Sequence, residues 1–413
     1  MKQKWQLIIF CLIHILIFTI IFNSNLYVSE GHYGTSLYFN YSSRVVALGQ
    51  LPYQDFAVEY PPLALVFLTL PRLIAANSAT YANVFAIEIL LFSLLGLLLI
   101  SALARRLNLS LWKTLAIYTL ALLAIGPIIA HRYDLIPAII VLLALYTFSQ
   151  GKHKTSWALL AVGVMTKIYP AILAPIFLLY YWRHRQNRQA IVGIATFAIT
   201  TAVIMAPFLL LSPDGLLNSF SYHAQRGLQC ESTYSSFLLL GQMLGLTSVE
   251  MEFSFGSLNI TSPLADVLAK VSPLVMLFSL VAVYWFFYKS QSEPAVVQQT
   301  PSLINQPDTA RIVSYSLLAM LAFIITNKVL SPQFIIWLYP LIPLVVGRWR
   351  RTSWLMFILI GLMTYLVYPV AYDGISEGHP LVTSILFMRN VSLITLAFLL
   401  PYVGNQLQPK LAR

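Results

Sequence analysis

The chain has 413 residues, of which 59% are hydrophobic and only 9% are charged. A soluble domain carries about a quarter charged residues, so this composition excludes an ordinary water-soluble protein. The net charge of +11 comes from short Lys and Arg clusters between apolar runs, which is typical of membrane topology signals and not of a nucleic-acid-binding surface. We predict an all-α, polytopic integral membrane protein that binds no nucleic acid.

Apolar runs follow one another along the chain and predict about twelve spans, since a membrane-spanning helix needs about 20 mostly apolar residues. The predicted spans are 7–22, 84–104, 114–130, 135–148, 157–166, 168–182, 190–211, 267–288, 312–326, 329–347, 354–372 and 381–402. The first is predicted to be an uncleaved anchor, because no small-residue cleavage site follows it. The run 62–76 is interrupted by Pro71 and Arg72, which predicts a short interfacial helix at the outer surface.

The distribution of lysine and arginine gives the orientation, because cytoplasmic loops carry an excess of both. The clusters are Lys2 and Lys4; Arg105 and Arg106; Lys152 and Lys154; Arg183, Arg185 and Arg188; and Arg348, Arg350 and Arg351. With these groups inside, both termini are cytoplasmic. We expect one membrane-embedded domain, 1–413, with outer loops at 23–83 and 212–266 and a polar cytoplasmic linker at 289–311.

Acidic residues gather on the outer side of this topology, where eleven of the fourteen lie. They are Glu30, Asp55, Glu59, Asp134, Asp214, Glu231, Glu250, Glu252, Asp266, Asp373 and Glu377. The outer cations are Arg44, Arg132, Lys167, Arg226 and Lys328. A cation at membrane depth is costly and usually faces a polar cavity or a partner. We therefore expect the functional site at the outer membrane surface.

The segment 50–65 of the first outer loop, QLPYQDFAVEYPPLAL, carries two acids four residues apart. On a helix, Asp55 and Glu59 would share one face. A carboxylate there could act as a general base that takes a proton from a hydroxyl nucleophile. Tyr60 and the two prolines after it form a rigid stop before the next apolar run. A helix cap or a surface acid is an equal alternative, because spacing alone does not distinguish them.

Two polar breaks between apolar runs could hold an anion. They contain His223, Arg226, Gln229 and Glu231 within 221–232, and Lys328 and Gln333 within 327–333. The planar guanidinium of Arg226 matches the geometry of phosphate, and His223 could add a hydrogen bond or a proton. Lys167, at the tip of a predicted hairpin, and Arg132 complete a candidate ring of cations. Each of these cations could instead extend toward the interface without binding anything.

Sequence patterns that bind metals or cofactors are absent. The chain has no His-x-x-x-His or Cys-rich spacing, no P-loop and no dinucleotide fingerprint. We therefore expect no metal and no cofactor, and a nucleotide-driven or redox enzyme is disfavoured.

Several segments resemble the membrane-embedded GT-C glycosyltransferases, and in particular glycosyltransferase family 87, the polyprenol-phosphate-mannose-dependent α-mannosyltransferase-like proteins. They are DFAVEYPPLAL (55–65), RYDLIPA (132–138), TKIYPAILAP (166–175), HAQRGLQCES (223–232) and NKVLSPQFIIWLYPL (327–341). The resemblance extends over most of the chain, but the last two predicted helices carry no recognisable motif.

The resemblance implies a GT-C-like fold that transfers a sugar from a polyprenyl-phosphate-sugar donor to a glycolipid or glycan acceptor at the extracytoplasmic face. The family's acidic residue in the first outer loop corresponds to Asp55, with Glu59 as the alternative. Attack by the acceptor hydroxyl opposite the leaving phosphate would invert the configuration. The compact loops and the absence of a luminal retention signal are compatible with a bacterial plasma membrane. We expect the donor phosphate at Arg226, Lys328, Lys167 and His223, and other substrate contacts at Tyr60, Arg132, Asp134, Gln229, Glu231 and Gln333.

Other functions are compatible with the same sequence. A transporter or flippase would also have about twelve spans with charged residues inside the membrane, although no internal repeat is evident. Another GT-C activity, such as protein O-glycosylation or lipid A modification, would use the same architecture. A purely structural membrane protein would not need Asp55, Arg226 and Lys328 on one side.

Overall fold

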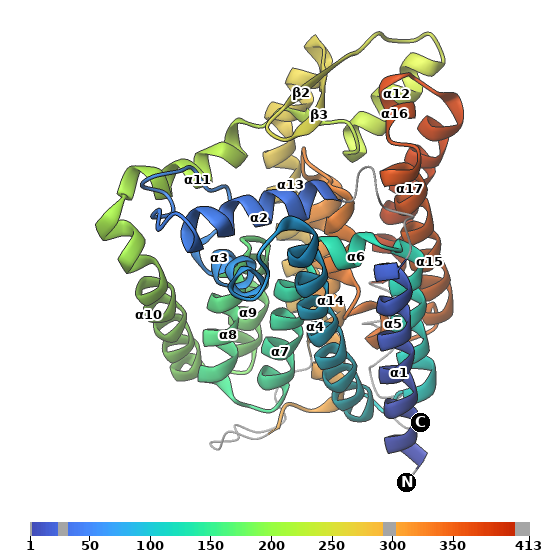
Figure 1. Cartoon of the computed structure of the whole chain (residues 1–413). Coiled ribbons are helices and arrows are strands. Elements are labelled where there is room, and N and C mark those ends of the chain that lie inside the picture. Colours follow the sequence, from blue (N-terminus) through green and yellow to red (C-terminus); the bar gives the residue numbers. More distant parts are fainter. Residues whose placement is uncertain (1, 24–31, 292–302, 401–413) are drawn as a thin grey trace. The chain divides into compact units, whose positions relative to one another are not determined.

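The computed structural model describes residues 2–23, 32–291 and 303–400, and nearly all of its regular structure is helical (Figure 1). Glu30 and most of the middle of the predicted 289–311 linker lie outside the described residues. The chain divides into two compact units. The first unit comprises Met1–Thr119, Pro127–Ala224 and Glu293–Thr309, and the second comprises Leu120–Gly126, Gln225–Ser292 and Ala310–Arg413.

Seven helices among the described residues are long and apolar enough to cross a membrane. They are α1 (Lys2–Asn23), α4 (Ser78–Arg106), α10 (Asn187–Leu211), α13 (Pro263–Ser290), α14 (Gln306–Thr326), α15 (Arg350–Tyr365) with its continuation to Val370, and α17 (Pro380–Leu399). A helical membrane protein is thus confirmed, whereas twelve spans are not.

The other five predicted spans fall on shorter elements. These are α5 (Leu111–Ile125) with α6 (Ile128–His131), α7 (Leu135–Ser149), α8 (His153–Thr166), the 3₁₀ turn η3 (Tyr169–Leu173) with α9 (Ala174–Arg183), and the 3₁₀ turns η4 (Pro332–Leu338) and η5 (Ile342–Leu344). Proline explains several of the breaks, because it lacks a backbone donor and clashes with the preceding turn. Pro127 follows α5, Pro170 lies in the first turn of η3, and Pro332 begins η4.

One end of the first unit gathers the ends of α4, α7 and α9. Nη2 of Arg106, the last residue of α4, donates to the carbonyl of Ser149 at the end of α7 (2.6 Å) and to the carbonyl of Ile304. His184, just after α9, has its Nε2 atom 3.3 Å from a carboxylate oxygen of Asp308. Three of the basic clusters of the sequence lie at these helix ends: Arg105 and Arg106; Lys152 and Lys154; and Arg183, Arg185 and Arg188.

The opposite end of the first unit carries the first outer loop. Lys167 follows α8 and contacts Asp134, which precedes α7. Ser212 follows α10, and its hydroxyl donates to the carbonyl of Tyr53 in the outer loop (3.0 Å). Because α7, α8, α9 and α10 run back and forth between the two ends, the predicted hairpin with Lys167 at its tip is confirmed (Figure 1).

The first outer loop folds as two short helical segments joined by turns. It contains α2 (His32–Val46), α3 (Pro62–Thr69) and the 3₁₀ turn η2 (Leu70–Leu73). Pro62 opens α3, where a proline is well tolerated because the first helical N–H has no partner within the helix. Residues 47–61 are not helical, so Asp55 and Glu59 do not share a helix face. The apolar side chains of this region are buried together: Tyr53, Phe56, Val58, Leu65 and Leu216.

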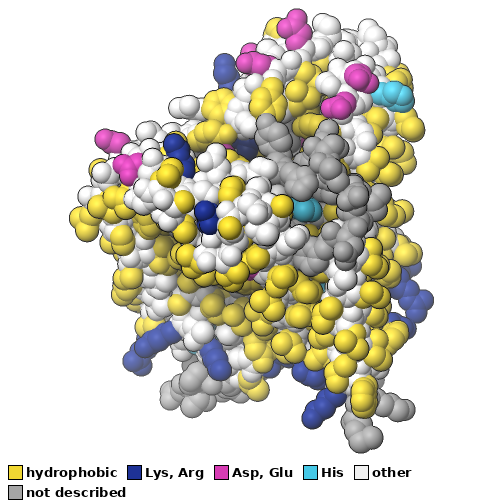
Figure 2. All heavy atoms as spheres, viewed as in Figure 1, with side chains coloured by type: hydrophobic (Ala, Val, Ile, Leu, Met, Phe, Trp, Pro, Cys, Tyr) yellow, Lys and Arg dark blue, Asp and Glu magenta, His cyan; other side chains and the backbone are white. Residues whose placement is uncertain are grey.

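Helix α10 packs closely against α8 at one glycine and exposes much of its apolar surface. Gly193 is its buried residue, and a Cβ atom there would lie 2.2 Å from Nε1 of Trp157 on α8. Hydrophobic side chains that include Ile191, Ile199 and Val203 are exposed along its other sides (Figure 2). Such exposed apolar surface matches a helix that faces lipid.

The second unit adds a small sheet to its helices. Strands β1 (Leu228–Gln229), β2 (Glu250–Ser254) and β3 (Ser257–Thr261) pair antiparallel in the order β1-β3-β2. An all-helical chain was predicted, so these strands are a correction. The hairpin turn between β2 and β3 is Phe255–Gly256, both with positive φ, which is the backbone of a two-residue hairpin turn. The helices α12 (Thr233–Met243) and α16 (Asp373–Ser376) complete this unit.

Candidate functional site

The first unit gathers charged and aromatic side chains beside the first outer loop. We call this set the Glu59 cluster: Tyr38, Glu59, Tyr60, Arg132, Tyr133, Asp134 and Lys167. The rings of Tyr38, Tyr60 and Tyr133 contact one another edge to face, with centroids 5.2, 5.8 and 6.2 Å apart. Burial, and after it the negative charge of Glu59, raises the pKa of the Tyr60 hydroxyl well above its usual range. Glu59 therefore lies next to these rings.

Lys167 and Asp134 form an ion pair in this cluster. Nζ of Lys167 lies 2.5 Å from Oδ1 of Asp134 and 4.6 Å from the centroid of the Tyr133 ring. Asp134 is fully buried, and the Tyr133 hydroxyl is buried without a hydrogen-bond partner among the described residues. The Lys167 ammonium carries three N–H donors and a positive charge, which suit an anionic ligand.

Gly34 makes room for the other cation of the cluster. A Cβ atom on Gly34 would lie 2.6 Å from Nη1 of Arg132 and 2.9 Å from the carbonyl oxygen of His131. Only a residue without a side chain fits between α2 and Arg132. Gly34 and Tyr38 were not predicted as site residues, because both lie in a loop helix whose sequence shows no repeated pattern around them.

Asp55 lies outside the Glu59 cluster. Its side chain is exposed, and its Oδ2 accepts a hydrogen bond from the backbone N–H of Leu51 (2.7 Å). Its own N–H donates to the carbonyl of Leu51 (2.9 Å). The carboxylate of Asp55 thus closes a local turn at the exposed surface and does not cap a helix.

The second unit contains a separate pair of cations. Arg226 donates from Nη2 to the hydroxyl of Ser257 (2.8 Å), and its buried Nε has no hydrogen-bond partner among the described residues. Burial, and after it the positive charge of Arg226, lowers the pKa of Lys328. Two cations this close favour an anion between them, because a shared negative charge relieves their repulsion.

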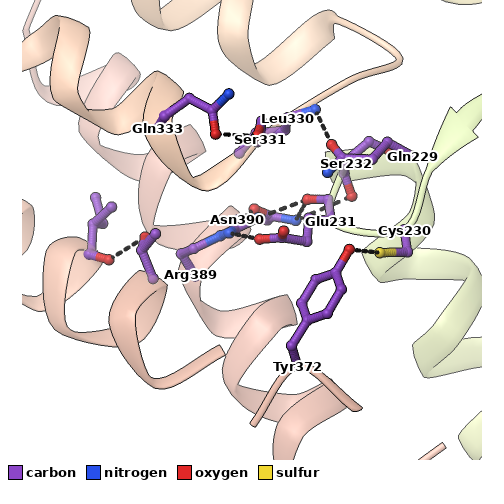
Figure 3. Close-up of polar contacts among 12 residues, drawn as sticks. Gln229, Cys230, Glu231, Ser232, Leu330, Ser331, Gln333, Tyr372, Arg389 and Asn390 are labelled. Carbon is purple, nitrogen blue, oxygen red and sulfur yellow. Dashed lines mark hydrogen bonds and ion pairs between the residues drawn. The ribbon is translucent and has the colours of Figure 1, made fainter. Parts of the chain in front are cut away.

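Three predicted substrate contacts make hydrogen bonds or ion pairs inside the second unit (Figure 3). Gln229 is buried, and its side-chain oxygen accepts from the N–H of Leu330 (2.8 Å). Glu231 is buried and pairs with Arg389 on α17 (2.8 Å). Gln333 is half-buried and accepts from the hydroxyl of Ser331 (2.7 Å). These geometries indicate structural roles for Gln229 and Glu231.

Arg389 was not predicted as an important residue, although the sequence carried a signal for it. It lies within the 20-residue apolar helix α17, where the sequence was judged to carry no motif. An arginine inside an apolar span is costly and therefore informative, so its position alone was a usable signal.

The predicted phosphate-binding residues are divided between the units. Lys167 and His223 belong to the first unit, whereas Arg226 and Lys328 belong to the second. His223 lies in α11 (Pro213–Gln225), and its side chain is outside the described residues. In the described part of the chain, no three His, Cys, Asp or Glu residues are grouped so as to hold a metal ion.

Comparison with the sequence models of known protein families identifies the family of the chain. The sequence model of glycosyltransferase family 87 matches residues 58–305, which is more than half of the chain. Comparison with curated proteins gave no significant match. The matched region includes Glu59, Asp134, Lys167 and Arg226 but begins after Asp55, and the family favours glycosyl transfer over transport. The chain therefore belongs to glycosyltransferase family 87 and is a membrane protein with the glycosyltransferase activity that this family implies.

Proposed function

We propose that the protein transfers a sugar, mannose or another hexose or pentose, from a polyprenyl-phosphate donor to a glycolipid or glycan acceptor. The transfer takes place at the extracytoplasmic face of a membrane, which we take to be a bacterial plasma membrane. The observation that carries this proposal is the position of a carboxylate, Glu59, beside buried tyrosines and a buried ion pair in a member of family 87.

The arrangement of the first outer loop supports Glu59 as the general base in preference to Asp55. Asp55 is exposed and bonded to its own turn, whereas Glu59 is half-buried next to the tyrosine rings. A general base must face the acceptor hydroxyl in a site that excludes water. We therefore assign catalysis to Glu59 and a structural role to Asp55.

The reaction needs one proton transfer and one displacement. Glu59 takes the proton of the acceptor hydroxyl. At the same time, the oxygen of that hydroxyl forms a bond to the anomeric carbon of the sugar. The bond between that carbon and the phosphate oxygen breaks, and the electron pair leaves with the polyprenyl phosphate. Attack opposite to the leaving group inverts the configuration, and no covalent enzyme intermediate forms.

Cations stabilise the charge that develops on the leaving phosphate. In the first unit we assign this role to Lys167, with Arg132 as a substrate contact. In the second unit, Arg226 and Lys328 form a separate candidate donor-phosphate site, since Arg226 has an open donor and the two cations lie close together. No nucleotide is needed, because the lipid phosphate already carries the activated sugar.

The orientation follows from the two ends of the first unit. Three basic clusters of this unit, at 105–106, 152–154 and 183–188, lie at the end where α9 finishes and α10 begins, and dark blue side chains are visible there (Figure 2). Cytoplasmic loops are enriched in Lys and Arg, so this end faces the cytoplasm and the Glu59 cluster faces outward. We propose that the shorter helices α7, α8 and α9 also cross the membrane, and that α2 and α3 lie at its outer surface.

The test is sugar transfer in reconstituted membranes given a labelled polyprenyl-phosphate sugar and a membrane glycolipid extract as acceptor. We expect Glu59→Gln to lower kcat by about 10²–10⁴-fold, since it removes the base without changing its shape. Asp55→Asn is the matched control and should stay close to the wild-type rate. Loss of activity in Asp55→Asn with a normal rate in Glu59→Gln would reverse the assignment. Absence of any transfer by the wild-type protein would refute the proposed function.

A further inference from the structure

A buried polar network in the second unit joins α17 to the turn that follows β1 (Figure 3). Arg389 on α17 donates from Nη1 to a carboxylate oxygen of Glu231 (2.8 Å) and from Nη2 to the carbonyl oxygen of Glu231 (2.7 Å). Its Nε donates to the side-chain oxygen of Asn390 (3.0 Å). One guanidinium thus fixes both the side chain and the backbone of Glu231.

Asn390 extends the same network along the turn. Its side-chain amide donates to the carbonyls of Glu231 and Ser232, both at 3.2 Å. Arg389 and Asn390 are both fully buried. A buried charge is retained only when it is paired and hydrogen-bonded, so this network fixes the turn to α17 at a defined position.

Gln229, at the end of β1 and directly before this turn, holds the segment that contains Lys328. The N–H of Gln229 donates to the carbonyl of Lys328 (3.0 Å), and the N–H of Leu330 donates to the side-chain oxygen of Gln229 (2.8 Å). The first bond holds the backbone of Lys328 itself, and the second holds the backbone two residues later. A shift of the turn would therefore move Lys328 with it.

Arg226 is fixed to the same frame. It lies three residues before Gln229, and its guanidinium bonds the hydroxyl of Ser257 at the start of β3. The neighbouring residue of the turn, Cys230, donates its N–H to the carbonyl of Leu258 in β3 (3.0 Å). Strand β3 and the turn thus support Arg226 from two sides.

We propose that Arg389 is a positioning residue for donor binding: through Glu231 and the Gln229 turn, it sets the separation and direction of Arg226 and Lys328. The inference rests on the proposed function, because it assumes that these two cations bind the donor phosphate. It extends that function to the last long helix, which lies beyond residue 305, where the family match ends. Arg389 itself touches no substrate.

The test compares Arg389→Lys and Glu231→Gln with the wild-type protein in nanodiscs. Both changes keep polar atoms in place but loosen the turn, so we expect the KM for the donor to rise by about tenfold to a hundredfold while kcat changes less. Binding of polyprenyl phosphate without a sugar, followed by tryptophan fluorescence, should weaken in parallel. Combining the two changes should cost little more than either alone, because both break one network.

The matched control is Arg311→Lys. Arg311 is also buried in the second unit, but it lies near the opposite end of α14 from Lys328. A merely structural role of Arg389 predicts the same outcome for both arginines: less folded protein, with unchanged donor KM in the folded fraction. That result for Arg389→Lys and Glu231→Gln would overturn the inference.

The failure of the inference is distinguishable from failure of the proposed function. If the wild-type protein transfers sugar and binds polyprenyl phosphate but the two network variants bind it equally well, only the inference is wrong. If the wild-type protein transfers no sugar from a polyprenyl-phosphate donor, the proposed function fails and the inference falls with it. If Arg389→Lys does not fold, Glu231→Gln alone decides the outcome by its donor KM.

Discussion

The two units each contain a buried ion pair, and the two pairs differ in how completely they are enclosed. In the first unit Lys167 keeps 14% of its side chain accessible, while its partner Asp134 has none. In the second unit Arg389 has none and Glu231 has 1%. The difference separates two roles. An accessible lysine can exchange part of its contact for a ligand, whereas an enclosed arginine holds the chain in place.

The hydrogen bonds support the same division. Arg389 uses its donors on a carboxylate, a backbone carbonyl and Asn390, which leaves it engaged on several sides. Lys167 contacts the Asp134 carboxylate and the face of the Tyr133 ring. The first pair fits a substrate site, and the second fits a structural support.

The largest expected effect is on stability, from removing the enclosed arginine. Arg389→Met leaves Glu231 buried without its charge partner, which typically costs about 3–5 kcal/mol. Thermal unfolding of the purified protein in detergent should show a clear drop in Tm. Lys167→Met should lower Tm less, because water reaches that site. Equal losses for the two variants would remove the distinction between an enclosed and an accessible pair.

The next effect is on activity, from removing the accessible lysine. We expect Lys167→Met to lower kcat/KM by about 100-fold, since it deletes a cation that stabilises charge on the leaving phosphate. Lys152→Met, at the opposite end of the first unit, serves as the control and should transfer sugar at the wild-type rate. A wild-type rate in Lys167→Met would exclude Lys167 from the reaction.

The smallest expected effect is on the pH dependence of the donor KM, which tests whether the second unit binds the donor. The pKa of Lys328 is lowered by burial and then by Arg226, so Lys328 loses its positive charge at a lower pH than an ordinary lysine. Only the protonated form attracts phosphate, so the donor KM should rise as the pH increases toward that lowered pKa. Lys328→Arg stays charged and should shift the rise to higher pH. An identical KM–pH profile for both proteins would remove Lys328 from donor binding.

The sequence predicted the parts of the fold that depend on local hydrophobicity. The seven long helices and the hairpin that carries Lys167 follow from apolar runs and from the basic residues that flank them. The five shorter spans were less predictable, because prolines such as Pro127 and Pro332 divide an apolar run into short pieces. The three strands were missed because each is short and lies inside a polar loop.

The candidate site was predictable only in part, because it depends on contacts between distant segments. Asp55 and Glu59 are nearly equivalent in the sequence, and their different environments arise from turns that bring Tyr38 and Tyr133 beside Glu59 alone. Glu231 was predicted as a substrate contact because its ion-pair partner could not be recognised from the sequence. That partner, Arg389, lies 158 residues later in the chain. An arginine inside an apolar helix has a high free-energy cost, and this position in the sequence could have identified Arg389.

The shortness of α7 and α8 has a consequence for how a lipid substrate reaches the protein. Their 15 and 14 residues rise by only about 22 and 21 Å, whereas the hydrocarbon layer of a bilayer is about 30 Å thick. In the proposed orientation, with the basic end of these helices at the inner headgroups, Lys167 and Asp134 would be recessed several ångströms beneath the outer headgroups. Either the donor sinks below its neighbouring lipids, or the bilayer thins locally around these two helices. The acyl-chain length of the host membrane thereby becomes a determinant of access to the site.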